Sequence, residues 1–449
     1  MPTRRRLLLA ALSGALAPAL RAADEDFGVF TDAPRLLLRP QRLRLLRRER
    51  ERQSMRWQQF SAIVTGKAPL AEPGFALALY YQVSGDKAAG MRAIEWAASA
   101  TDIRQIALVY DWCQPLLEGR QKEQIEDKLL RSLRTPAANE FFAMRTRAFA
   151  AIAVADKLPD HGAAILGDLV TKWWRGTVAP SWNSGRELVR KENFIHLYEL
   201  LHAVRDNLNI DLRENAVKSF RELPTYFVVS DYPAIFPGGE NDFRIPAAKD
   251  AQPDLTRAAH SRAAGLSMVA YDTNALESQF LQGWLMQDNF AMRGGLGSPY
   301  EFLWANPYQP GLSYHHMPLL WHDPQTGRLF ARSSWDEEAT LIGFFDRQMQ
   351  WFEDGRIRAF KPSIKPQQVG PATFLAVTAP AKFDVDEEEP ATLFLMGLDP
   401  RTAYDVEIDD EEMSEEWSDA GGVLALHFPS PIKAGVRLKK SLFANGAAR

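Results

Sequence analysis

Hydrophobic positions along this chain follow two different periods, and the change between them falls near residue 325. From about Pro40 to Met292, apolar residues recur at the three- and four-residue spacing of amphipathic helices. Short polar breaks such as Ser84-Gly85-Asp86 separate the helical segments. Because the connections are short, successive helices are expected to lie antiparallel to their neighbours. This rhythm suits a ring of helical hairpins.

After Gly327 the apolar residues alternate in short runs, with Gly, Pro, Asp and Asn between several of them. Many short strands at close spacing favour a sandwich over a parallel sheet. The acidic runs Asp384–Glu389 and Asp409–Glu416 are expected to be exposed turns of that sandwich. The pattern therefore predicts an α+β multidomain protein, with an all-α domain over 24–325 and a small antiparallel β-sandwich over 326–449.

The first 23 residues, Met1–Ala23, are typical of an export signal. Arg4, Arg5 and Arg6 precede an apolar run and then a series of small residues. The paired arginines before Leu7 suggest a twin-arginine signal, and an ordinary secretory signal is the alternative. The apolar run is too short for a stable membrane anchor, which needs about 20 residues. The expected location is the bacterial periplasm or the outside of the cell, with no stable insertion in the membrane.

Composition narrows the classes of function. The chain has 449 residues, 53 Lys and Arg against 57 Asp and Glu, and a single cysteine. This balance of charge argues against a nucleic-acid-binding protein, which would show a basic excess. One cysteine excludes an intramolecular disulfide and a zinc site built from several cysteines. No cofactor is predicted, although a divalent cation is left open.

Four segments in a fixed order resemble the heparinase II/III-like proteins and the related alginate lyases. They are Pro34–Leu38, Ala76–Asp86, Ala107–Trp112 and Leu329–Trp335. That family combines an incomplete α/α toroid with a C-terminal antiparallel β-sandwich. The resemblance therefore implies the same architecture here, and an exported lyase that cleaves a uronic-acid-containing polysaccharide by β-elimination.

The resemblance also implies positions for the site. β-Elimination needs a group that neutralises the substrate carboxylate, a base for the α-proton and an acid for the leaving oxygen. In the family, an Asn or His on a toroid helix and a Tyr from a following loop supply these groups. The catalytic residues expected on this basis are Asn193, His196, Tyr232 and Glu240. The family's His-x-His-x-Asp motif is absent, because no histidine lies between His322 and His427.

Further polar and aromatic residues are candidates for binding an acidic polysaccharide or oligosaccharide. Arg244 could form a two-pronged ion pair with a uronate carboxylate. His315 and His316 could reach the cleft from the other side and replace the missing histidine. The full set of predicted binding residues is Arg244, Asp242, Asn241, Tyr198, His202, Trp182, His315 and His316. His260 and Arg262 are weaker candidates.

Helical geometry leaves the role of the segment Lys191–His202 open. At about 100° per residue, Asn193 and His196 share one face, whereas Tyr198 and His202 share another. Only one face can point into the cavity of a toroid, so ordinary packing is the alternative for these histidines.

Two other classes of function remain open. A glycoside hydrolase on an α/α toroid could pair Glu192 or Glu199 with Glu240 or Asp242, because hydrolases place two carboxyl groups across the cleft. A non-catalytic glycan-binding protein derived from a lyase is the third possibility.

Overall fold

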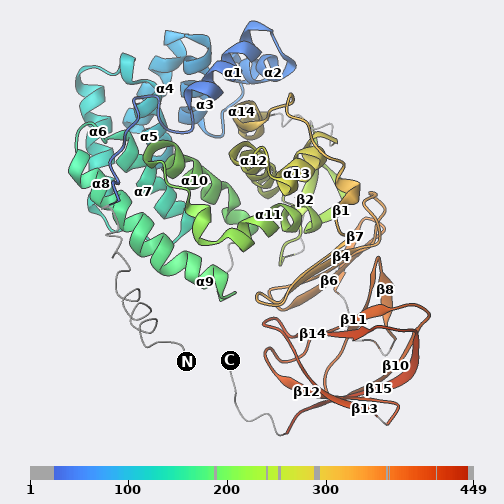
Figure 1. Cartoon of the computed structure of the whole chain (residues 1–449). Coiled ribbons are helices and arrows are strands. Elements are labelled where there is room, and N and C mark those ends of the chain that lie inside the picture. Colours follow the sequence, from blue (N-terminus) through green and yellow to red (C-terminus); the bar gives the residue numbers. More distant parts are fainter. Residues whose placement is uncertain are drawn as a thin grey trace, which may run out of the picture.

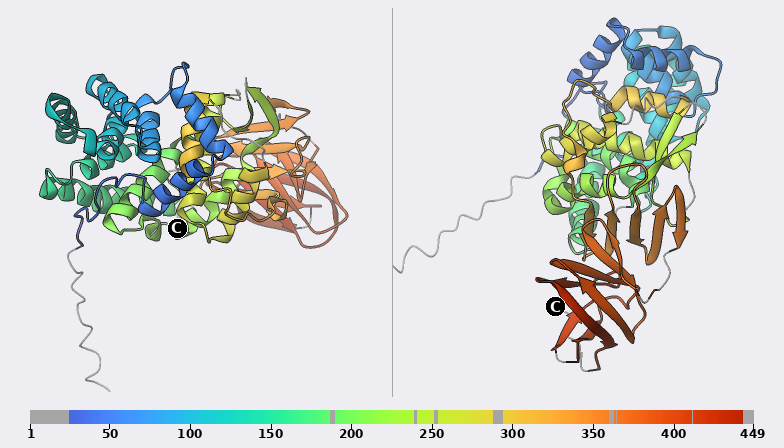
Figure 2. Two further views of the ribbon diagram at one scale, coloured as in Figure 1. Left: turned by 90° about the horizontal axis from the view of Figure 1, so that it is seen from above. Right: turned by 90° about the vertical axis from the view of Figure 1, so that its right-hand side faces the viewer.

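The computed structural model describes residues 25–442, apart from 187–189, 239–240, 251–253, 288–293, 360–362, 364 and 411. Side chains at 237–238, 241–242, 287, 359 and 412 also lie outside the description, as does the predicted signal segment Met1–Ala23. The predicted α+β architecture is confirmed: helices gather at one end of the molecule and sheets at the other (Figures 1 and 2). Within the described residues, no helix is long and apolar enough to cross a membrane.

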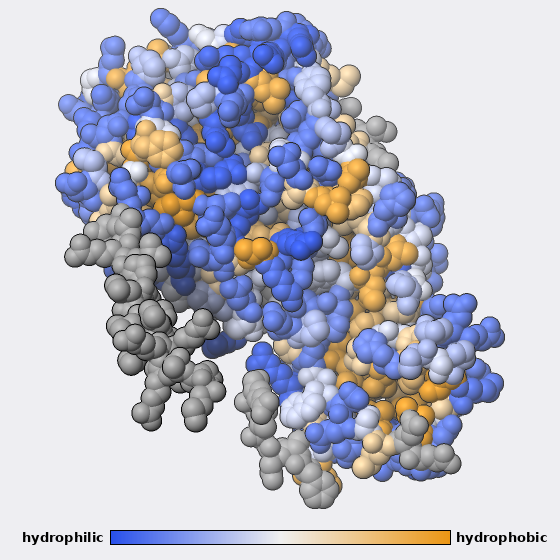
Figure 3. All heavy atoms as spheres, viewed as in Figure 1, coloured by the Kyte–Doolittle hydropathy of each residue, from blue (hydrophilic) through white to orange (hydrophobic). Residues whose placement is uncertain are grey.

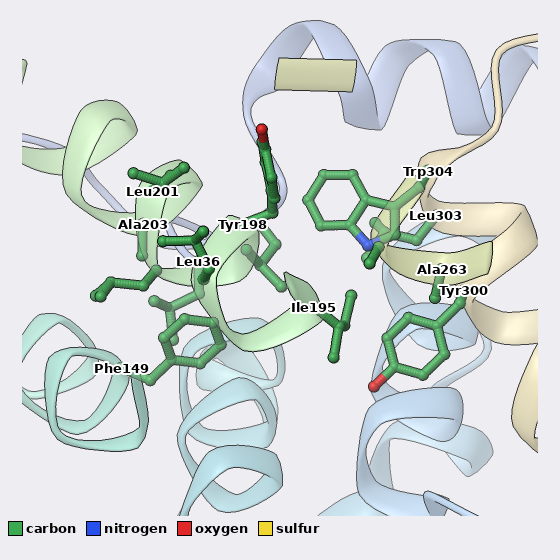
Figure 4. Close-up of a cluster of buried hydrophobic side chains, with 14 of the residues drawn as sticks. Leu36, Phe149, Ile195, Tyr198, Leu201, Ala203, Ala263, Tyr300, Leu303 and Trp304 are labelled. Atoms are coloured by element: carbon green, nitrogen blue, oxygen red, sulfur yellow. The ribbon is translucent and has the colours of Figure 1, made fainter. Parts of the chain in front are cut away.

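Six helices form the inner ring of the toroid, and each contacts the next along the chain. They are α3 (Pro73–Ser84), α5 (Ile103–Trp112), α7 (Phe141–Ala153), α10 (Phe194–Leu208), α12 (Leu255–Tyr271) and α14 (Gly294–Trp304). The last of them, α14, also contacts α3, so the two ends of the series meet. These helices are buried on most of their circumference, because they pack against each other and against an outer layer. Figure 4 shows side chains of α7, α10, α12 and α14 together in this core.

The remaining helices lie outside the ring. They are α1 (Pro40–Glu51), α2 (Met55–Thr65), α4 (Lys87–Ser99), α6 (Gly119–Arg134), α8 (Pro159–Asp168), the π-helical segment Leu169–Val178, α9 (Ala179–Asn183), α11 (Val217–Val229) and α13 (Leu276–Gln287). Short 3-10 turns occupy Gln114–Leu116, Lys191–Asn193, Leu212–Asn215 and Tyr314–His316. An outer helix such as α6 buries only Ile125, Leu129 and Leu133, at the four-residue spacing of a single apolar stripe.

Two segments of the helical half differ from the prediction. The apolar spacing over Arg39–Val64 predicts one long amphipathic segment, but the structure has two helices there, because Ser54 accepts the N–H of Trp57 at 3.3 Å and starts α2. The family resemblance implies a loop over Asp231–Arg244, but this segment is a β-hairpin, made of β1 (Asp231–Gly238) and β2 (Asn241–Pro246). Among the described residues, its strands pair with each other and with no larger sheet. A two-stranded sheet needs little alternation of apolar and polar residues, so the sequence pattern indicates these strands only weakly.

The C-terminal half consists of three sheets. The first contains β3 (Leu320–Asp323), β4 (Arg328–Arg332), β5 (Leu341–Phe345), β6 (Gln348–Glu353) and β7 (Arg356–Ala359) in that order. The second has the order β14 (Val423–Phe428), β11 (Ala391–Met396), β9 (Ala372–Ala376), β8 (Gln367–Val369). The third has the order β10 (Ala381–Glu387), β15 (Ile432–Lys440), β12 (Ala403–Ile408), β13 (Glu412–Trp417). All pairs are antiparallel except β9 and β11.

The acidic runs predicted as turns are partly strands, which corrects the sequence analysis. β10 covers 381–387, and it buries Phe383 and Val385 while Asp384 and Asp386 are exposed. β13 covers 412–417 at the edge of the third sheet. Acidic residues are compatible with a strand when they occupy every second position, because successive side chains point to opposite faces.

The five-stranded sheet lies between the toroid and the second sheet. One set of its side chains, including Phe330 and Phe345, joins the core of the toroid. The other set, including Leu329 and Phe344, packs against Phe374 of the second sheet. Because both faces are covered, β4 and β5 are buried at every position. A separate apolar core lies between the second and third sheets.

Candidate functional site

A cavity of about 210 Å³ opens where the N-terminal ends of α10 and α12 meet the end of the β1–β2 hairpin. Its volume exceeds the roughly 150 Å³ that accommodates benzene in an engineered protein cavity. The lining residues are Lys191, Glu192, Pro246, Ala247, Asp254, Thr256, Arg257, His260 and Ser261. Most of them are polar, so the cavity can offer several hydrogen bonds to a ligand.

Local structure fixes the walls of the cavity. Asp254 is the N-cap of α12, and its Oδ1 accepts the backbone N–H of Arg257 at 3.0 Å. Lys191 and Glu192 belong to the 3-10 turn that leads into α10. The hairpin end is held by a hydrogen bond of 2.8 Å from the N–H of Ala247 to the carbonyl of Ser230. Each group is therefore positioned by a helix start or by strand pairing.

The two cations among the described lining residues, Lys191 and Arg257, already have carboxylate partners. Lys191 is buried, donates to the Asp231 carboxylate and also to the carbonyl of Phe227 at 2.7 Å. Burial lowers the pKa of Lys191, against the opposing attraction of Asp231. Arg257 forms a two-pronged pair with Asp250 at 3.1 and 3.0 Å. These charges are largely neutralised before any ligand arrives.

Two carboxylates in the lining have no cation bound directly among the described residues. Glu192 is exposed and makes no hydrogen bond or salt bridge there, and Asp254 accepts only the backbone N–H at the start of α12. With Lys191 and Arg257 neutralised by their partners, these two carboxylates leave the described lining with a net negative charge. This balance does not favour an anionic ligand.

Behind the cavity lies a buried network of charges from α5, α7 and α10. Glu199 is fully buried and accepts hydrogen bonds from Arg104, with an Nε–Oε2 distance of 3.0 Å, and from Arg145. Arg104 also bonds Glu72 at 3.0 Å. Burial by itself would raise the pKa of Glu199, but the two arginines outweigh it and lower that pKa to about 2. Glu199 therefore stays ionised and cannot donate a proton in catalysis.

Two histidines lie beside this network. Burial, reinforced by the charge of Arg145, lowers the pKa of His196 to about 3. Its ring packs against Phe142 with centroids 5.4 Å apart, and Nδ1 has no hydrogen-bond partner among the described residues. His260 lines the cavity itself, and burial lowers its pKa as well. Both imidazoles are neutral at physiological pH.

The predicted catalytic residues are not all brought together. His196 lies next to the buried network, and Asn193 lies in the turn before α10, but neither is among the residues that line the cavity. Tyr232 is fully buried, and its hydroxyl donates to Oε1 of Gln350 at 2.7 Å. This bond directs Tyr232 toward the first sheet. Glu240 lies outside the described residues.

Of the predicted binding residues on the hairpin, Arg244 makes contacts within the protein that hold the hairpin in place. Arg244 donates to the carbonyl of Pro233 at 3.1 Å, and its guanidinium lies 5.7 Å from the centroid of Trp284. The backbones of Asn241 and Asp242 pair with Gly238 and Pro237, and their side chains lie outside the description.

The other predicted binding residues are dispersed. Tyr198 lines a different cavity on the outer side of α10, and Trp182 lines a narrow one between α11 and β3. His202 is buried in the ring, stacked on Trp304 with centroids 4.4 Å apart. His315 and His316 are exposed in a 3-10 turn.

Sequence reasoning missed Asp254, Lys191 and Arg257 as members of the site. The pattern Asp-Leu-Thr-Arg before an apolar helix is an N-cap signal and could have indicated Asp254. The pairing of Arg104 and Arg145 with Glu199 has a weaker sequence signal. That signal is the presence of charged residues at buried positions of apolar helices. Within the described residues, no group of three or more His, Cys, Asp or Glu side chains could hold a metal ion.

Comparisons with known proteins give a distant structural likeness. No family model matches the sequence, and no curated protein matches it. Among solved structures, one titled a glycoside hydrolase is 10% identical, covering 82% of this chain and 71% of that chain, with a TM-score of 0.32. A beta-arabinofuranosidase of family GH127 is also 10% identical, covering 93% of this chain and 80% of its own, with a TM-score of 0.33.

Proposed function

We propose that this chain is a carbohydrate-active hydrolase whose site is the cavity lined by Glu192, Asp254 and His260. The observation that carries the proposal is the presence of two carboxylates without a directly bound cation in one sugar-sized cavity. Glycoside hydrolysis uses such a pair, one group acting as acid and the other as base or nucleophile. The resemblance of the toroid segments to glycan-cleaving proteins supports the choice of a carbohydrate as substrate.

In this mechanism the two carboxyl groups have different roles. Asp254 accepts a backbone N–H at the positive end of the α12 dipole, an arrangement that suits a negatively charged base or nucleophile. Glu192 is exposed at the mouth and would protonate the oxygen of the leaving sugar. Neutral His260 would accept or donate a hydrogen bond to a substrate hydroxyl.

The charge of the lining supports a neutral saccharide over a uronic acid. A uronate would need a cation to neutralise its carboxylate, but Lys191 and Arg257 are already paired with Asp231 and Asp250. The predicted signal at Met1–Ala23 would place this enzyme in the periplasm or outside the cell.

β-Elimination is the second candidate, and one observation favours it. His260 faces the cavity as a neutral imidazole, which is the form that can take up a proton. That reaction would yield an unsaturated product, whereas hydrolysis would not.

The test measures both products on one set of substrates. The purified protein is incubated with neutral and uronic-acid polysaccharides, and reducing ends and the ultraviolet absorbance of unsaturated sugars are followed. We expect reducing ends without the ultraviolet signal. Glu192→Gln and Asp254→Asn should each lower kcat by about 100- to 10,000-fold. Asparagine is also a good N-cap, so Asp254→Asn keeps the start of α12.

The control is Glu95→Gln, an exposed position on α4 away from the cavity, which should leave kcat unchanged. Full activity in both Glu192→Gln and Asp254→Asn would refute the assigned roles. An ultraviolet signal that is lost in a His260→Gln variant would establish elimination in place of hydrolysis.

A further inference from the structure

A second and larger cavity of about 350 Å³ lies on the outer side of the ring. It is bounded by the turn Leu212–Asn215, the first half of α11, the C-terminal end of α12 and the start of α13. Among the described residues, the two cavities share no lining residue. His260 lines the first cavity and Asp272 lines the second. These two residues are twelve positions apart along α12, which corresponds to about 18 Å at the helical rise per residue.

The hydroxyl of Tyr198 is the unusual group in this second cavity. The side chain lines the cavity and the residue is only 3% exposed. Its hydroxyl makes no hydrogen bond within the described part of the chain, although Arg213, Asp272 and Asp211 lie near enough to influence it electrostatically. The hydroxyl oxygen is not among the fully buried atoms that lack a hydrogen bond, so water in the cavity can reach and bond it. A ligand hydroxyl that enters the cavity could take the place of that water.

The polar walls around Tyr198 form a rigid, internally paired frame. Arg213 donates to Asp211 at 2.9 Å and to Asp272 at 2.6 Å. The hydroxyl of Tyr271 donates to Asp211 at 3.0 Å, and the guanidinium of Arg213 lies 4.6 Å from the centre of that ring. Because these bonds fix the side chains before binding, little conformational entropy is lost when a ligand enters.

The same pairing indicates which ligands fit. The second arginine of the lining, Arg221, bonds Glu277 at 3.1 Å, so both guanidinium groups already have carboxylate partners. Glu214 adds a further negative charge. An anion would therefore meet no unpaired cation among the described lining residues. Carboxylate oxygens and guanidinium N–H groups can still accept from and donate to neutral hydroxyls.

Apolar side chains complete the cavity. Phe220, Pro224 and Met268 line it beside the polar frame. Hydroxyls around the edge of a ring and C–H groups on its faces are the two features of a sugar, and this lining offers a partner for each. Small-molecule sites generally combine an apolar wall with a few fixed polar groups in this way.

We propose that this cavity is a second, non-catalytic saccharide site that binds a neutral mono- or disaccharide through the hydroxyl of Tyr198 and the Asp211–Arg213–Asp272 frame. The proposal rests on the proposed function for the class of ligand. Its place in the molecule rests on the cavity and on the Tyr198 hydroxyl, which has no protein partner among the described residues. Such a site would keep a carbohydrate chain attached to the enzyme apart from the bond that is cleaved.

Binding is measured by calorimetry with neutral monosaccharides and disaccharides, such as glucose, galactose, arabinose, xylose and their dimers. The full chain with Glu192→Gln is used, so that no ligand is consumed. We expect Tyr198→Phe in this background to weaken binding by about tenfold, the effect of losing one hydrogen bond of typical strength. Its melting temperature should stay equal or rise, since no intramolecular bond is lost.

The matched control is Tyr404→Phe in the third sheet, also a buried tyrosine, which should leave binding unchanged. Saccharide binding that is the same in Tyr198→Phe would overturn the second site, and so would the absence of any binding. The two proposals fail separately. Binding sensitive to Tyr198 without hydrolysis would refute only the proposed reaction, and hydrolysis without such binding would refute only this site.

Discussion

The toroid and the outer two sheets have cores of opposite character. The toroid buries ion pairs such as Glu199 with Arg104 and Lys191 with Asp231. After residue 365, the described chain buries only two polar side chains, Thr373 and Ser418, and both are neutral. Burying charge is costly unless each group is paired, and folds retain it where it positions other groups. The difference is consistent with the placement of the proposed site in the toroid.

The first sheet is the connection between these two regions. Its buried polar residues all bond to the helical half: Arg328 to the hydroxyl of Tyr226 at 2.7 Å, Arg332 to the carbonyl of Asp231 at 2.8 Å, and Gln350 to Tyr232. Asp231 is in turn the partner of Lys191, which lines the first cavity. The sheet therefore supports the hairpin that forms one wall of the candidate site.

The largest effect expected from this contrast is that of Glu199→Gln. Removing the carboxylate leaves buried Arg145 without its partner and buried Arg104 with Glu72 alone, which should cost about 3–5 kcal/mol of unfolding free energy. Urea unfolding followed by circular dichroism measures it. Glu407→Gln, which removes a partly exposed pair with Arg437 in the third sheet, serves as control and should change stability by at most about 1 kcal/mol. Equal losses in the two variants would remove the distinction between the regions.

A somewhat smaller effect is expected from Leu395→Ala between the second and third sheets. Leu395 is fully buried in their shared core, and its truncation should cost about 2–5 kcal/mol. Because this core does not touch the first cavity, kcat per folded molecule should be unchanged well below the melting temperature. A drop in kcat there would show that the outer sheets contribute to the site.

The smallest effect concerns pH and His196. Its pKa is lowered to about 3 from an ordinary 6.5, so the native state disfavours the protonated ring. Stability from this group is therefore complete above pH 6.5 and falls as the pH decreases from 6.5 toward 3. His196→Phe should change the melting temperature little at neutral pH, because the neutral ring packs against Phe142. In acid the variant should lose less stability than the wild type, as measured by scanning calorimetry.

Glu199 also affects the stability of the native state in acid, so the effect of His196 has to be measured at a pH where Glu199 does not contribute. Its lowered pKa of about 2 also makes the native state lose stability in acid, but only below its ordinary value of 4.5. Between pH 6.5 and 4.5, the difference between His196→Phe and the wild type reports His196, because the lowered pKa values of His202 and His260 act equally in both proteins. Identical pH profiles for His196→Phe and wild type over that interval would contradict the assignment.

The sequence by itself determined the succession of helices and then strands, because the spacing of apolar residues follows local geometry. The change from helical to alternating spacing near residue 325 predicted the two halves, and the helical segment Lys191–His202 predicted the first part of α10. It also indicated Glu192 and His260, which lie in the lining of the first cavity. Each of these predictions depends on residues within a few turns of one another.

Only the tertiary structure decided which of these residues meet. Asp254 and Glu192 are 62 positions apart, and nothing in local spacing shows that the starts of α10 and α12 enclose one cavity. The same is true of Tyr232, whose partner Gln350 lies 118 residues away on another sheet. Helix and strand periods record which face of an element is apolar. They do not record which partner covers it, because any apolar surface of matching shape satisfies the hydrophobic effect.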